Sequence, residues 1–456
     1  MRVLGIGDWN DLGDLYLQLQ REGHAVRVHI ADPTAHDILD GLIQRVHDWR
    51  DHLGWVREVG EDGVIVFETA HHGRLQDELR SAGYQVIGGC AFGDRLEADR
   101  AYGQQIMCNA GMKVLPSWSF TDAHEAAQFV LAHPARYVLK WDATADVVCS
   151  TYVGRSPDGA DVAALLRMRT CRPTVGHKVA VQNSAGHPSA GHQPTGRLLL
   201  TLHVEGIEVG VGAYFNGQRF LTPACIDWEH KRFFPGGIGE LTGEMGTLAT
   251  FHGAQPLFER TLARFASELR AAGYVGYINL NTIIDERGIW PLEFTCRFGY
   301  PGFALLGTLQ RDGWSDLFRR LLDPAEKTFS VTADYAVGVV ITVPPFPYPD
   351  GYERLSKGAP VIVLDRRPED DAHLHLAEVA SRDGALVCSG QIGYPLVVSG
   401  TGRDAESARD AAYARVLRVV IPDMRYRQDI GESFIARDRE TLSAWGYLAD
   451  ESRLVR

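Results

Sequence analysis

The first ninety residues alternate between two hydrophobic periods, and this alternation constrains the fold more than any other feature of the chain. Four short apolar runs have the pattern of strands: residues 2–6, 25–30, 63–67 and 84–87. Two stretches between them have the spacing of helices: residues 12–22 and 75–82. Strands that are separated by helices pair in parallel through crossover connections. The pattern therefore predicts an α/β domain with a parallel sheet over residues 1–95.

The turn after the first strand, GIGDWNDLGD, is rich in glycine but lacks the glycine spacing of known nucleotide-binding turns. Gly5, Gly7 and Gly13 do not form the GxGxxG fingerprint of dinucleotide-binding proteins. One interpretation is a tight strand-to-helix turn. The other is a ligand site, because open α/β sheets bind ligands at the carboxyl ends of their strands.

Composition excludes several classes of function. The 456 residues include 46 Lys+Arg and 58 Asp+Glu, a net charge of −12, which argues against non-specific binding of nucleic acid. No apolar run approaches the ~20 residues of a membrane span. The start of the chain does not have the pattern of a signal peptide. Seven scattered cysteines without a Cys-x-x-Cys pair predict no disulfide framework and no zinc ribbon, which favours a cytoplasmic protein.

The rest of the chain divides into a middle region and a third unit. Residues 256–273 have a helical pattern, with four apolar residues on one side: Leu257, Leu262, Phe265 and Leu269. Residues 183–196, NSAGHPSAGHQPTG, have the composition of a mobile surface loop; His187 and His192 offer a metal site as the alternative. The third unit has strand patterns at 335–343 and 360–364 and a helix at 405–419. The last twenty residues are charged and look peripheral.

The segment most informative about chemistry is residues 275–301, VGYINLNTIIDERGIWPLEFTCRFGYP. It predicts a β-hairpin in which Asn281 and Glu293 face one site from neighbouring strands. Carboxylate and amide oxygens suit Mg²⁺, a hard cation found with nucleotide phosphates. Arg297, two residues after Thr295, is expected on the same face, where it would bind an anionic group. The alternative is an ordinary hairpin with a surface ion pair.

This segment resembles the metal-binding hairpin of phosphoribosylamine–glycine ligases, which are ATP-grasp enzymes. The family pattern is Glu-Phe-Asn-x-Arg-Phe-Gly-Asp-Pro-Glu, and this chain reads EFTCRFGYPG from Glu293 to Gly302. Upstream, EHKRFFPGGIGELTGEMGT at 229–247 resembles the family's Asp-His-Lys-Arg … Asn-Thr-Gly-Gly-Met-Gly signature. Downstream, RYRQDIG at 425–431 resembles the family's C-terminal domain. The similarity spans most of the chain in the right order.

The resemblance implies an ATP-grasp fold of class α/β with three parts and a tail. These are an N-terminal Rossmann-like domain (1–95), an ATP-grasp core (96–330), a small C-terminal α+β domain (331–435) and a peripheral tail (436–456). It also implies an ATP-dependent carboxylate–amine ligase that forms an acyl phosphate. The expected partners are a small-molecule carboxylate and an amine, with neither nucleic acid nor membrane. No oligomeric state is predicted.

The resemblance also assigns site residues. For ATP they are Arg100, Lys140 and Glu208; for Mg²⁺ or Mn²⁺ they are Glu293, Asn281 and Thr295; for the acyl phosphate and the acceptor they are Arg297, His230, Lys231, Arg232, Thr242 and Gly243. Lys231 carries both a catalytic and a substrate-binding assignment. Arg100 takes the place of a family lysine, so the positive charge is retained.

Four departures from the family pattern predict an altered substrate. Residues 141–154 contain no glycine before Gly154, although the family has a glycine-rich loop there. Thr295 replaces the metal-ligating asparagine. The N-terminal Gly-Gly-Arg-Glu-His-Ala is replaced by residues 8–13, DWNDLG. The C-terminal Gly-Gly-Arg becomes residues 392–394, IGY. Two alternatives remain open: the family's own purine reaction, and a non-catalytic ligand-binding protein with a degenerate ATP-grasp fold.

Overall fold

The computed structural model describes residues 1–141, 151–170, 197–332, 334–348 and 350–449. The predicted loop at 183–196, with His187 and His192, lies outside the described residues. So does most of the glycine-poor stretch at 141–154.

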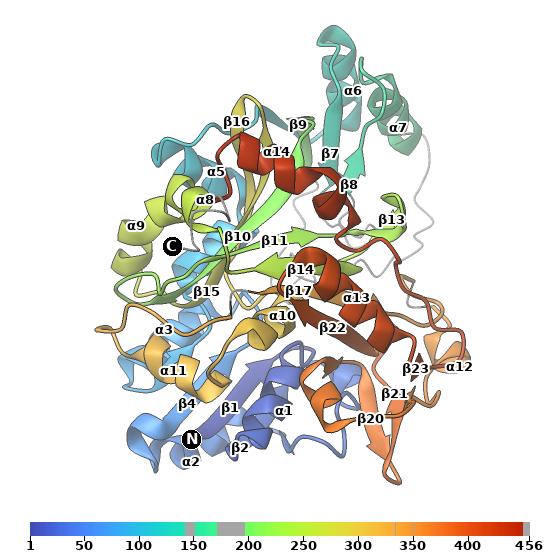
Figure 1. The fold of residues 1–456 in the computed structure, drawn as a ribbon. Helices are drawn as coiled ribbons and strands as arrows, with labels where there is room; N and C mark the ends of the chain where they lie inside the picture. The colour runs from blue at the N-terminus through green and yellow to red at the C-terminus, as the bar shows by residue number, and fades with distance from the viewer. Residues whose placement is uncertain (142–150, 171–196, 333, 349, 450–456) are drawn as a thin grey trace.

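The N-terminal domain is the parallel sheet that the alternating pattern predicts (Figure 1). Its strand order is β3-β2-β1-β4-β5, with β1 Arg2–Gly7, β2 Ala25–Ile30, β3 Arg45–Val46, β4 Gly63–Phe67 and β5 Gln85–Ile87. The helices of this part are α1 Gly13–Arg21, α2 Leu53–Arg57, α3 Gly73–Ser81, α4 Ala91–Ala98 and α5 Arg100–Asn109. Every residue of β4 is buried, as its unbroken apolar run requires. The four predicted strands and two predicted helices are confirmed.

A small lobe projects from the rest of the molecule, at the top of Figure 1. It contains β6 Ser117–Phe120, α6 Ala123–Ala132, β7 Tyr137–Trp141, β8 Thr151–Val153, α7 Ala160–Thr170 and β9 Leu198–Leu202. Its four strands have the order β6-β9-β7-β8. The lobe has its own hydrophobic core, in which Tyr137, Leu139 and Leu200 are fully buried.

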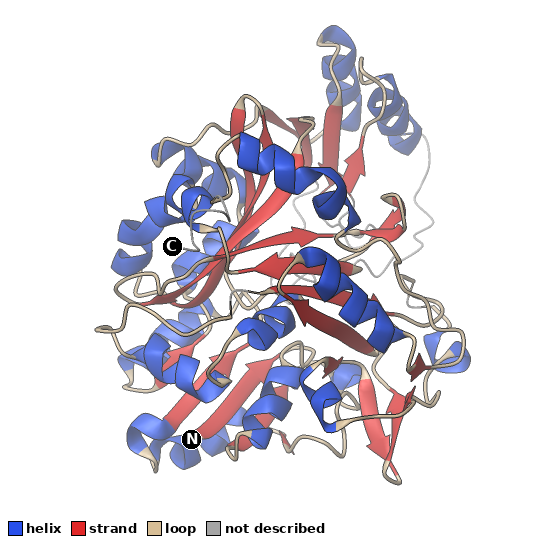
Figure 2. Ribbon diagram, viewed as in Figure 1, coloured by secondary structure: helices blue, strands red, loops and turns tan. Residues whose placement is uncertain are grey.

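An eight-stranded antiparallel sheet forms the centre of the chain (Figure 2). Its order is β16-β15-β10-β11-β14-β17-β22-β19, with β10 Ile207–Asn216, β11 Cys225–Glu229, β14 Gly246–Thr250, β15 Val275–Asp285, β16 Gly288–Thr295, β17 Tyr335–Ile341, β19 Leu374–Leu376 and β22 Leu396–Gly402. Helices that pack around it include α10 Gly302–Leu309, α11 Trp314–Leu322 and α13 Ala405–Val416. The sheet continues across the predicted boundary at 330/331, because β14 pairs directly with β17. The predicted domain limits remain a prediction.

Smaller elements complete the C-terminal part. They are the hairpin β12 Arg232–Phe234 with β13 Ile238–Leu241, the hairpin β20 Val379–Arg382 with β21 Ala385–Cys388, the pair β18 Ile362–Val363 with β23 Val419–Val420, α12 Tyr352–Leu355, a helical turn Phe434–Asp438 and α14 Arg439–Ala444. Leu442 of α14 is fully buried, so the predicted peripheral tail contributes to the hydrophobic core.

The single helix predicted at 256–273 is wrong, because the segment is broken at Thr261. The structure has α8 Gln255–Arg260, a 3-10 turn Leu262–Phe265 and α9 Ala266–Ala271. Thr261 leaves the helical region, with φ −125° and ψ −99°, and its hydroxyl donates to the carbonyl of Leu257 at 2.6 Å. A side-chain bond of this kind competes with the helical ladder. The predicted apolar face is nevertheless buried, because each short piece keeps its own side toward the core.

Two observations on the described residues bear on the predictions from composition. None of the helices in these ranges has the length and apolarity that a membrane crossing requires. The five cysteines in the same ranges are free thiols: Cys90, Cys108, Cys225, Cys296 and Cys388.

Candidate functional site

The hairpin of β15 and β16 brings the predicted oxygen ligands together. Asn281 and Glu293 are direct register partners. Two positions further along each strand, Asn279 is the register partner of Thr295. Because side chains alternate along a strand, all four residues lie on one face of the central sheet. The predicted cross-strand pairing of Asn281 with Glu293 is confirmed. Their role as metal ligands remains a prediction.

Two predicted phosphate-binding cations meet at Glu293. Arg100, the first residue of α5, donates a hydrogen bond from Nη2 to Glu293 Oε2. Lys140, from β7 of the lobe, places Nζ 3.6 Å from the same oxygen. The three side chains, named here the cation group, are each about a quarter exposed. A carboxylate of the central sheet thus joins cations from two other parts of the chain.

The charges around Glu293 keep it ionised. Lys140 has the largest influence; with Arg100 it outweighs the effect of burial and lowers the pKa of Glu293 far below its ordinary value. Positive charge near an acid favours its charged form. Glu293 is therefore a carboxylate throughout the neutral pH range, which is the form that binds a metal ion.

Lys231 and Glu208 form a second ion pair on the same face. Lys231 Nζ lies 2.8 Å from Glu208 Oε1 and 3.0 Å from Glu229 Oε2, while Asn281 Nδ2 donates to Glu208 Oε1 at 2.8 Å. Burial by itself lowers the pKa of Lys231, but the surrounding carboxylates, Glu208 first, raise it well above the ordinary value. Burial raises the pKa of Glu208, yet Lys231 and the amide of Asn281 outweigh this and lower it.

The donor set fits a Mg²⁺ that is shared with a nucleotide. In the described ranges no three His, Cys, Asp or Glu side chains group as a metal site. Mg²⁺ keeps several waters and needs only one or two carboxylates together with phosphates. Glu293, with the amide oxygen of Asn281 beside it, meets that smaller requirement. Arg100 and Lys140 lie where they can neutralise phosphate oxygens.

The predicted acceptor residues His230, Lys231 and Arg232 do not point to one place. His230 is buried, and its Nε2 accepts the Gly431 N–H at 3.3 Å. Burial, and then the charge of Arg427, lowers the pKa of His230 to about 4. The ring is therefore neutral. Arg232 Nη1 donates to the carbonyl of Gly239 at 2.7 Å. Their shared role as an anion site remains a prediction.

Thr242 and Gly243 follow the same hairpin. The backbone N–H and the hydroxyl of Thr242 both donate to the carbonyl of Lys231, at 2.8 and 2.9 Å. Thr242 therefore fixes the main chain that carries the Lys231 side chain. Gly243 is half-buried beside it.

Arg297 lies in a buried ion pair just beyond the end of β16. It was expected on the face of Thr295, but β16 ends at Thr295 and the alternation ends with it. Arg297 is buried, and its Nε donates to Glu97 Oε1 at 3.0 Å; Glu97 Oε2 accepts the Cys296 N–H at 2.7 Å. Burial lowers the pKa of Arg297, but Glu97 and then Asp11 outweigh it and raise the pKa. The strand alternation does not extend to Arg297, so the expected shared face remains a prediction.

Three acidic residues next to Lys231 are not among the predicted site residues. Asp227 and Glu229 lie on the same face of β11, and Glu244 precedes β14; they are named here the acidic cluster. Burial, then the charge of Glu229, raises the pKa of Asp227 to about 8 and the pKa of Glu244 well above its ordinary value. The sequence feature that could have identified them is a pair of carboxylates at alternate positions of a strand, beside the quoted HKR and TGEMG motifs.

Carboxylates also gather at the carboxyl ends of β1 and β4. Glu68 is fully buried, and its Oε2 accepts the Asp11 N–H at 2.9 Å. Gly7 is required by this packing, since a Cβ there would lie 2.1 Å from Glu68 Oε2. Asp8 lies 3.5 Å from His72, which raises the pKa of that imidazole through their hydrogen bond. The predicted tight turn is confirmed, and its surroundings are acidic.

Glu68 makes stability depend on pH. Burial, then the charge of Asp11, raises the pKa of Glu68 to about 8. An acid with a raised folded-state pKa loses stability as pH rises from its ordinary pKa toward the raised one. We expect Glu68→Gln to match the natural protein near about pH 5 and to be more stable near about pH 8.5, by at most about 4 kcal/mol. Thermal unfolding at both pH values measures this; an equal difference at both would contradict it.

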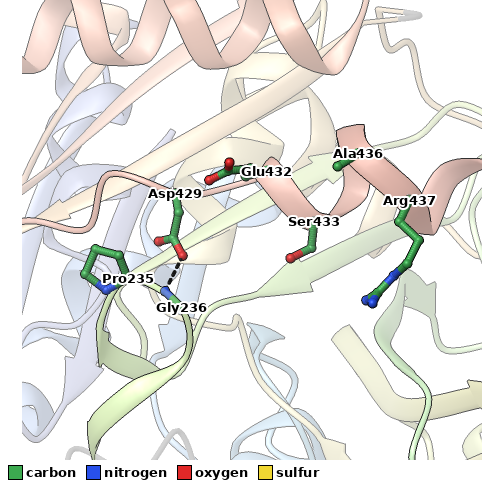
Figure 3. Close-up of a pocket in the computed structure, with 7 residues that line it drawn as sticks. All are labelled: Pro235, Gly236, Asp429, Glu432, Ser433, Ala436 and Arg437. Atoms are coloured by element: carbon green, nitrogen blue, oxygen red, sulfur yellow. Dashed lines mark hydrogen bonds between the residues drawn. The ribbon is translucent and has the colours of Figure 1, made fainter.

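A hollow of about 400 Å³ lies between the loop of the β12–β13 hairpin and the turn Phe434–Asp438 (Figure 3). Asp429 closes one side, where its Oδ2 accepts the Gly236 N–H at 2.8 Å. Arg427 binds Asp429 and also donates to the carbonyl of Arg232 at 2.9 Å. The hollow therefore lies at the contact between the C-terminal segment and the β12–β13 hairpin. It includes no member of the cation group or the acidic cluster.

Comparisons with known proteins show which proteins this chain is similar to. The family "Phosphoribosylglycinamide synthetase, C domain" matches residues 336–433. The phosphoribosylamine–glycine ligase of Neisseria meningitidis serogroup B is 23% identical over 453 residues, covering 96% of this chain and 100% of the relative. The crystal structure of the Thermotoga maritima phosphoribosylamine–glycine ligase has a TM-score of 0.68 at 19% identity, covering 94% of this chain and 100% of that one.

A second kind of ATP-grasp enzyme is also similar. The biotin carboxylase domain of Hydrogenobacter thermophilus 2-oxoglutarate carboxylase, solved with MgADP and bicarbonate, has a TM-score of 0.61 at 12% identity and covers 99% of both chains. The predicted ATP-grasp fold and the resemblance to phosphoribosylamine–glycine ligases are thus confirmed. The named relatives support a carbon–nitrogen ligase.

Proposed function

We propose that this chain is an ATP-dependent carboxylate–amine ligase whose substrates differ from those of phosphoribosylamine–glycine ligases. The observation that carries the proposal is the cation group, where Arg100 and Lys140 converge on the ionised Glu293. Such a site can hold a triphosphate through its cations and a divalent metal through its carboxylate.

Each side chain of the site has a role under this proposal. Arg100 and Lys140 bind and orient the ATP phosphates. Glu293, with Asn281 or Thr295, binds Mg²⁺, or Mn²⁺ in its place. Bound MgATP supplies the phosphoryl group that activates the carboxylate substrate and turns its oxygen into a leaving group. The amine nitrogen then attacks the activated carbonyl carbon, and the amide bond forms as inorganic phosphate leaves and the nitrogen loses a proton; ADP is the other product.

Glu208 and Lys231 form the side of the site that faces the reacting groups. Glu208 holds Lys231 by an ion pair and holds the amide of Asn281 by a hydrogen bond. Lys231 therefore has a fixed position and a permanent charge. In that position we infer that it stabilises negative charge on the activated carboxylate.

The altered substrate is supported by the acidic end of the N-terminal sheet. Asp8, Asp11 and Glu68 surround the place where the family pattern quoted above has Gly-Gly-Arg-Glu-His-Ala. Burial raises the pKa of Asp8, but its hydrogen bond to His72 and the charge of that imidazole outweigh this and lower the pKa. Asp8 is therefore a carboxylate that repels a phosphorylated ligand, so the family's own purine reaction fits this edge poorly. The alternative, a non-catalytic binding protein, is favoured by Thr295, a weaker metal ligand than the asparagine of the family pattern.

Calorimetry with MgATP tests the proposal first. We expect the natural chain to bind MgATP and Lys140→Ala to bind it at least about tenfold more weakly, because a charged hydrogen bond contributes about 1.5–3 kcal/mol. Lys327→Ala, at an exposed lysine of the central part, is the matched control and should leave binding unchanged. Release of ADP with a panel of carboxylic acids and amines then separates a ligase from a binding protein. Binding without any turnover would favour the latter.

A further inference from the structure

A histidine of the central sheet reaches the N-terminal domain through a buried chain of hydrogen bonds. Nδ1 of His375, on β19, lies 2.7 Å from Oδ2 of Asp14, on α1, although the two residues are 361 positions apart in the sequence. The other ring nitrogen, Nε2, lies 2.9 Å from the hydroxyl of Ser399 on β22. The same hydroxyl lies 3.0 Å from Nδ1 of His373. These four side chains are named here the histidine relay.

The order of the groups is that of a Ser-His-Asp catalytic triad, but burial excludes a hydrolytic role. Such a triad needs a serine hydroxyl that a substrate can reach. Ser399 is 0% exposed, and the side chains of His375 and Asp14 are 2% and 3% exposed. The histidine relay therefore acts on the protein itself.

One arrangement of protons gives every hydrogen of the relay an acceptor. With His375 neutral, its Nδ1–H donates to Asp14, and its Nε2 accepts the O–H of Ser399. The Nδ1–H of His373 then donates to the oxygen of that hydroxyl. The second oxygen of Asp14, Oδ1, is buried without a partner in the described part of the chain, so the carboxylate depends on its Oδ2 contacts. Losing the contact to His375 is therefore costly.

Asp14 also connects the relay with α11. Its Oδ2 accepts from Nε2 of Gln18 at 2.6 Å, and Oε1 of Gln18 accepts the indole N–H of Trp314 at 2.9 Å. Trp314 is the first residue of α11 and is buried. The first turn of α1 is thus held to β19, β22 and α11 together.

The end of α1 that the relay holds is the end next to the candidate site. Asp14 is the second residue of α1, and the turn at residues 8–13 leads directly into the helix. Asp11 of this turn is near enough to Arg297 for its charge to raise the pKa of that guanidinium. Arg297 lies two residues beyond β16, the strand that carries Glu293. The relay therefore connects the acidic edge of the N-terminal sheet with the sheet that carries the cation group.

We propose that His375 is a positioning residue, which sets the place of the turn at residues 8–13 relative to the cation group. It acts through Asp14 and has no contact of its own with substrate or nucleotide. Its effect on the reaction rests on the proposed function, in which this edge takes the altered substrate. Its effect on the turn does not.

Two substitutions of His375 separate the two halves of the relay. Asparagine can place its amide nitrogen where Nδ1 lies and donate to Asp14, whereas glutamine reaches the place of Nε2 and keeps only the contact to Ser399. We expect His375→Gln to speed hydrogen exchange at the amides of residues 11–16 at least about tenfold, and His375→Asn to speed it less. Exchange in α3, which belongs to the same domain but not to the relay, should not change. His124→Gln, at an exposed histidine of the lobe, is the matched control.

ADP release with the most active acid and amine gives a readout that a purely structural contact would not move. We expect His375→Gln to raise the KM for the amine at least about tenfold, with kcat and MgATP affinity within about twofold of the natural chain. His375→Asn should restore most of the KM.

The two readouts separate the positioning role from the proposed function. Unchanged exchange at residues 11–16 in His375→Gln, an equal increase in α1 and α3, or an unchanged KM for the amine overturns the positioning role. Failure of the natural chain to bind MgATP overturns the proposed function, and hydrogen exchange still decides whether His375 holds the turn.

Discussion

Replacing Glu293 with glutamine is expected to abolish Mg²⁺-dependent ATP turnover while leaving the fold intact. Glutamine keeps the size of the side chain but removes the charge that a divalent metal needs. Loss of a residue that only orients a metal ligand reduces activity by about 10–100-fold, so loss of the ligand itself should reduce turnover by at least about 100-fold. The measurement is ADP release with the most active acid and amine, in Mg²⁺ and in Mn²⁺.

The effect on folding should be small, because the partners of Glu293 are partly hydrated. Arg100 and Lys140 are each about a quarter exposed, so water can solvate them when the carboxylate is lost. Glu205→Gln is the matched control: it removes an exposed carboxylate that pairs with Arg136 at 2.6 Å, and turnover should not change. If Glu293→Gln and the natural chain bind ATP equally with and without Mg²⁺, and neither turns it over, the ligase proposal fails.

A substitution at Thr295 tests the opposite change in the same part of the site, the gain of a metal-binding oxygen. We expect Thr295→Asn to keep or strengthen Mg²⁺ binding, because an amide oxygen then lies on the same face as Glu293. Titration of ATP-bound protein with Mg²⁺ measures it. Weaker Mg²⁺ binding in Thr295→Asn would mean that the metal does not lie between β15 and β16.

The sequence was sufficient where structure depends on neighbours along the chain. The N-terminal sheet follows from the alternation of two hydrophobic periods, and β4 has the predicted limits, 63–67. The hairpin of β15 and β16 follows from two strand patterns around a short turn, and its register places Asn281 opposite Glu293. In both cases period and turn chemistry determine the geometry locally.

The sequence was insufficient where the partners are far apart in the chain. β14 pairs with β17 across about ninety residues of sequence, so the sheet continues through the boundary at 330/331 that the family resemblance implies. Glu97 and Arg297 are separated by 200 positions. The members of the acidic cluster are closer in sequence, at positions 227–244, but they meet only when β11 pairs with the segment that leads into β14. Periodicity carries no information about which distant charges come together.

The buried pair of Glu97 and Arg297 leads to the second large effect, on stability. We expect Arg297→Met to lower the free energy of unfolding by about 3–5 kcal/mol, because it leaves the carboxylate of Glu97 buried without its charge partner. Both side chains are almost fully buried, at 5% and 9% exposed. Urea unfolding of the full chain, followed by tryptophan fluorescence, measures the change. Arg382→Met removes a similar contact at 2.7 Å between half-exposed partners and should lower stability by less than about 1 kcal/mol.

A double variant distinguishes a lost charge partner from lost packing. Glu97→Leu combined with Arg297→Met removes both charges, and apolar replacements of a buried ion pair are often neutral in stability. The double variant should therefore recover most of what Arg297→Met loses. Stability unchanged in Arg297→Met, with ADP release strongly reduced, would contradict this expectation. It would return Arg297 to the role that the family pattern implies, binding the activated carboxylate, because a guanidinium that the fold does not need is available to a substrate.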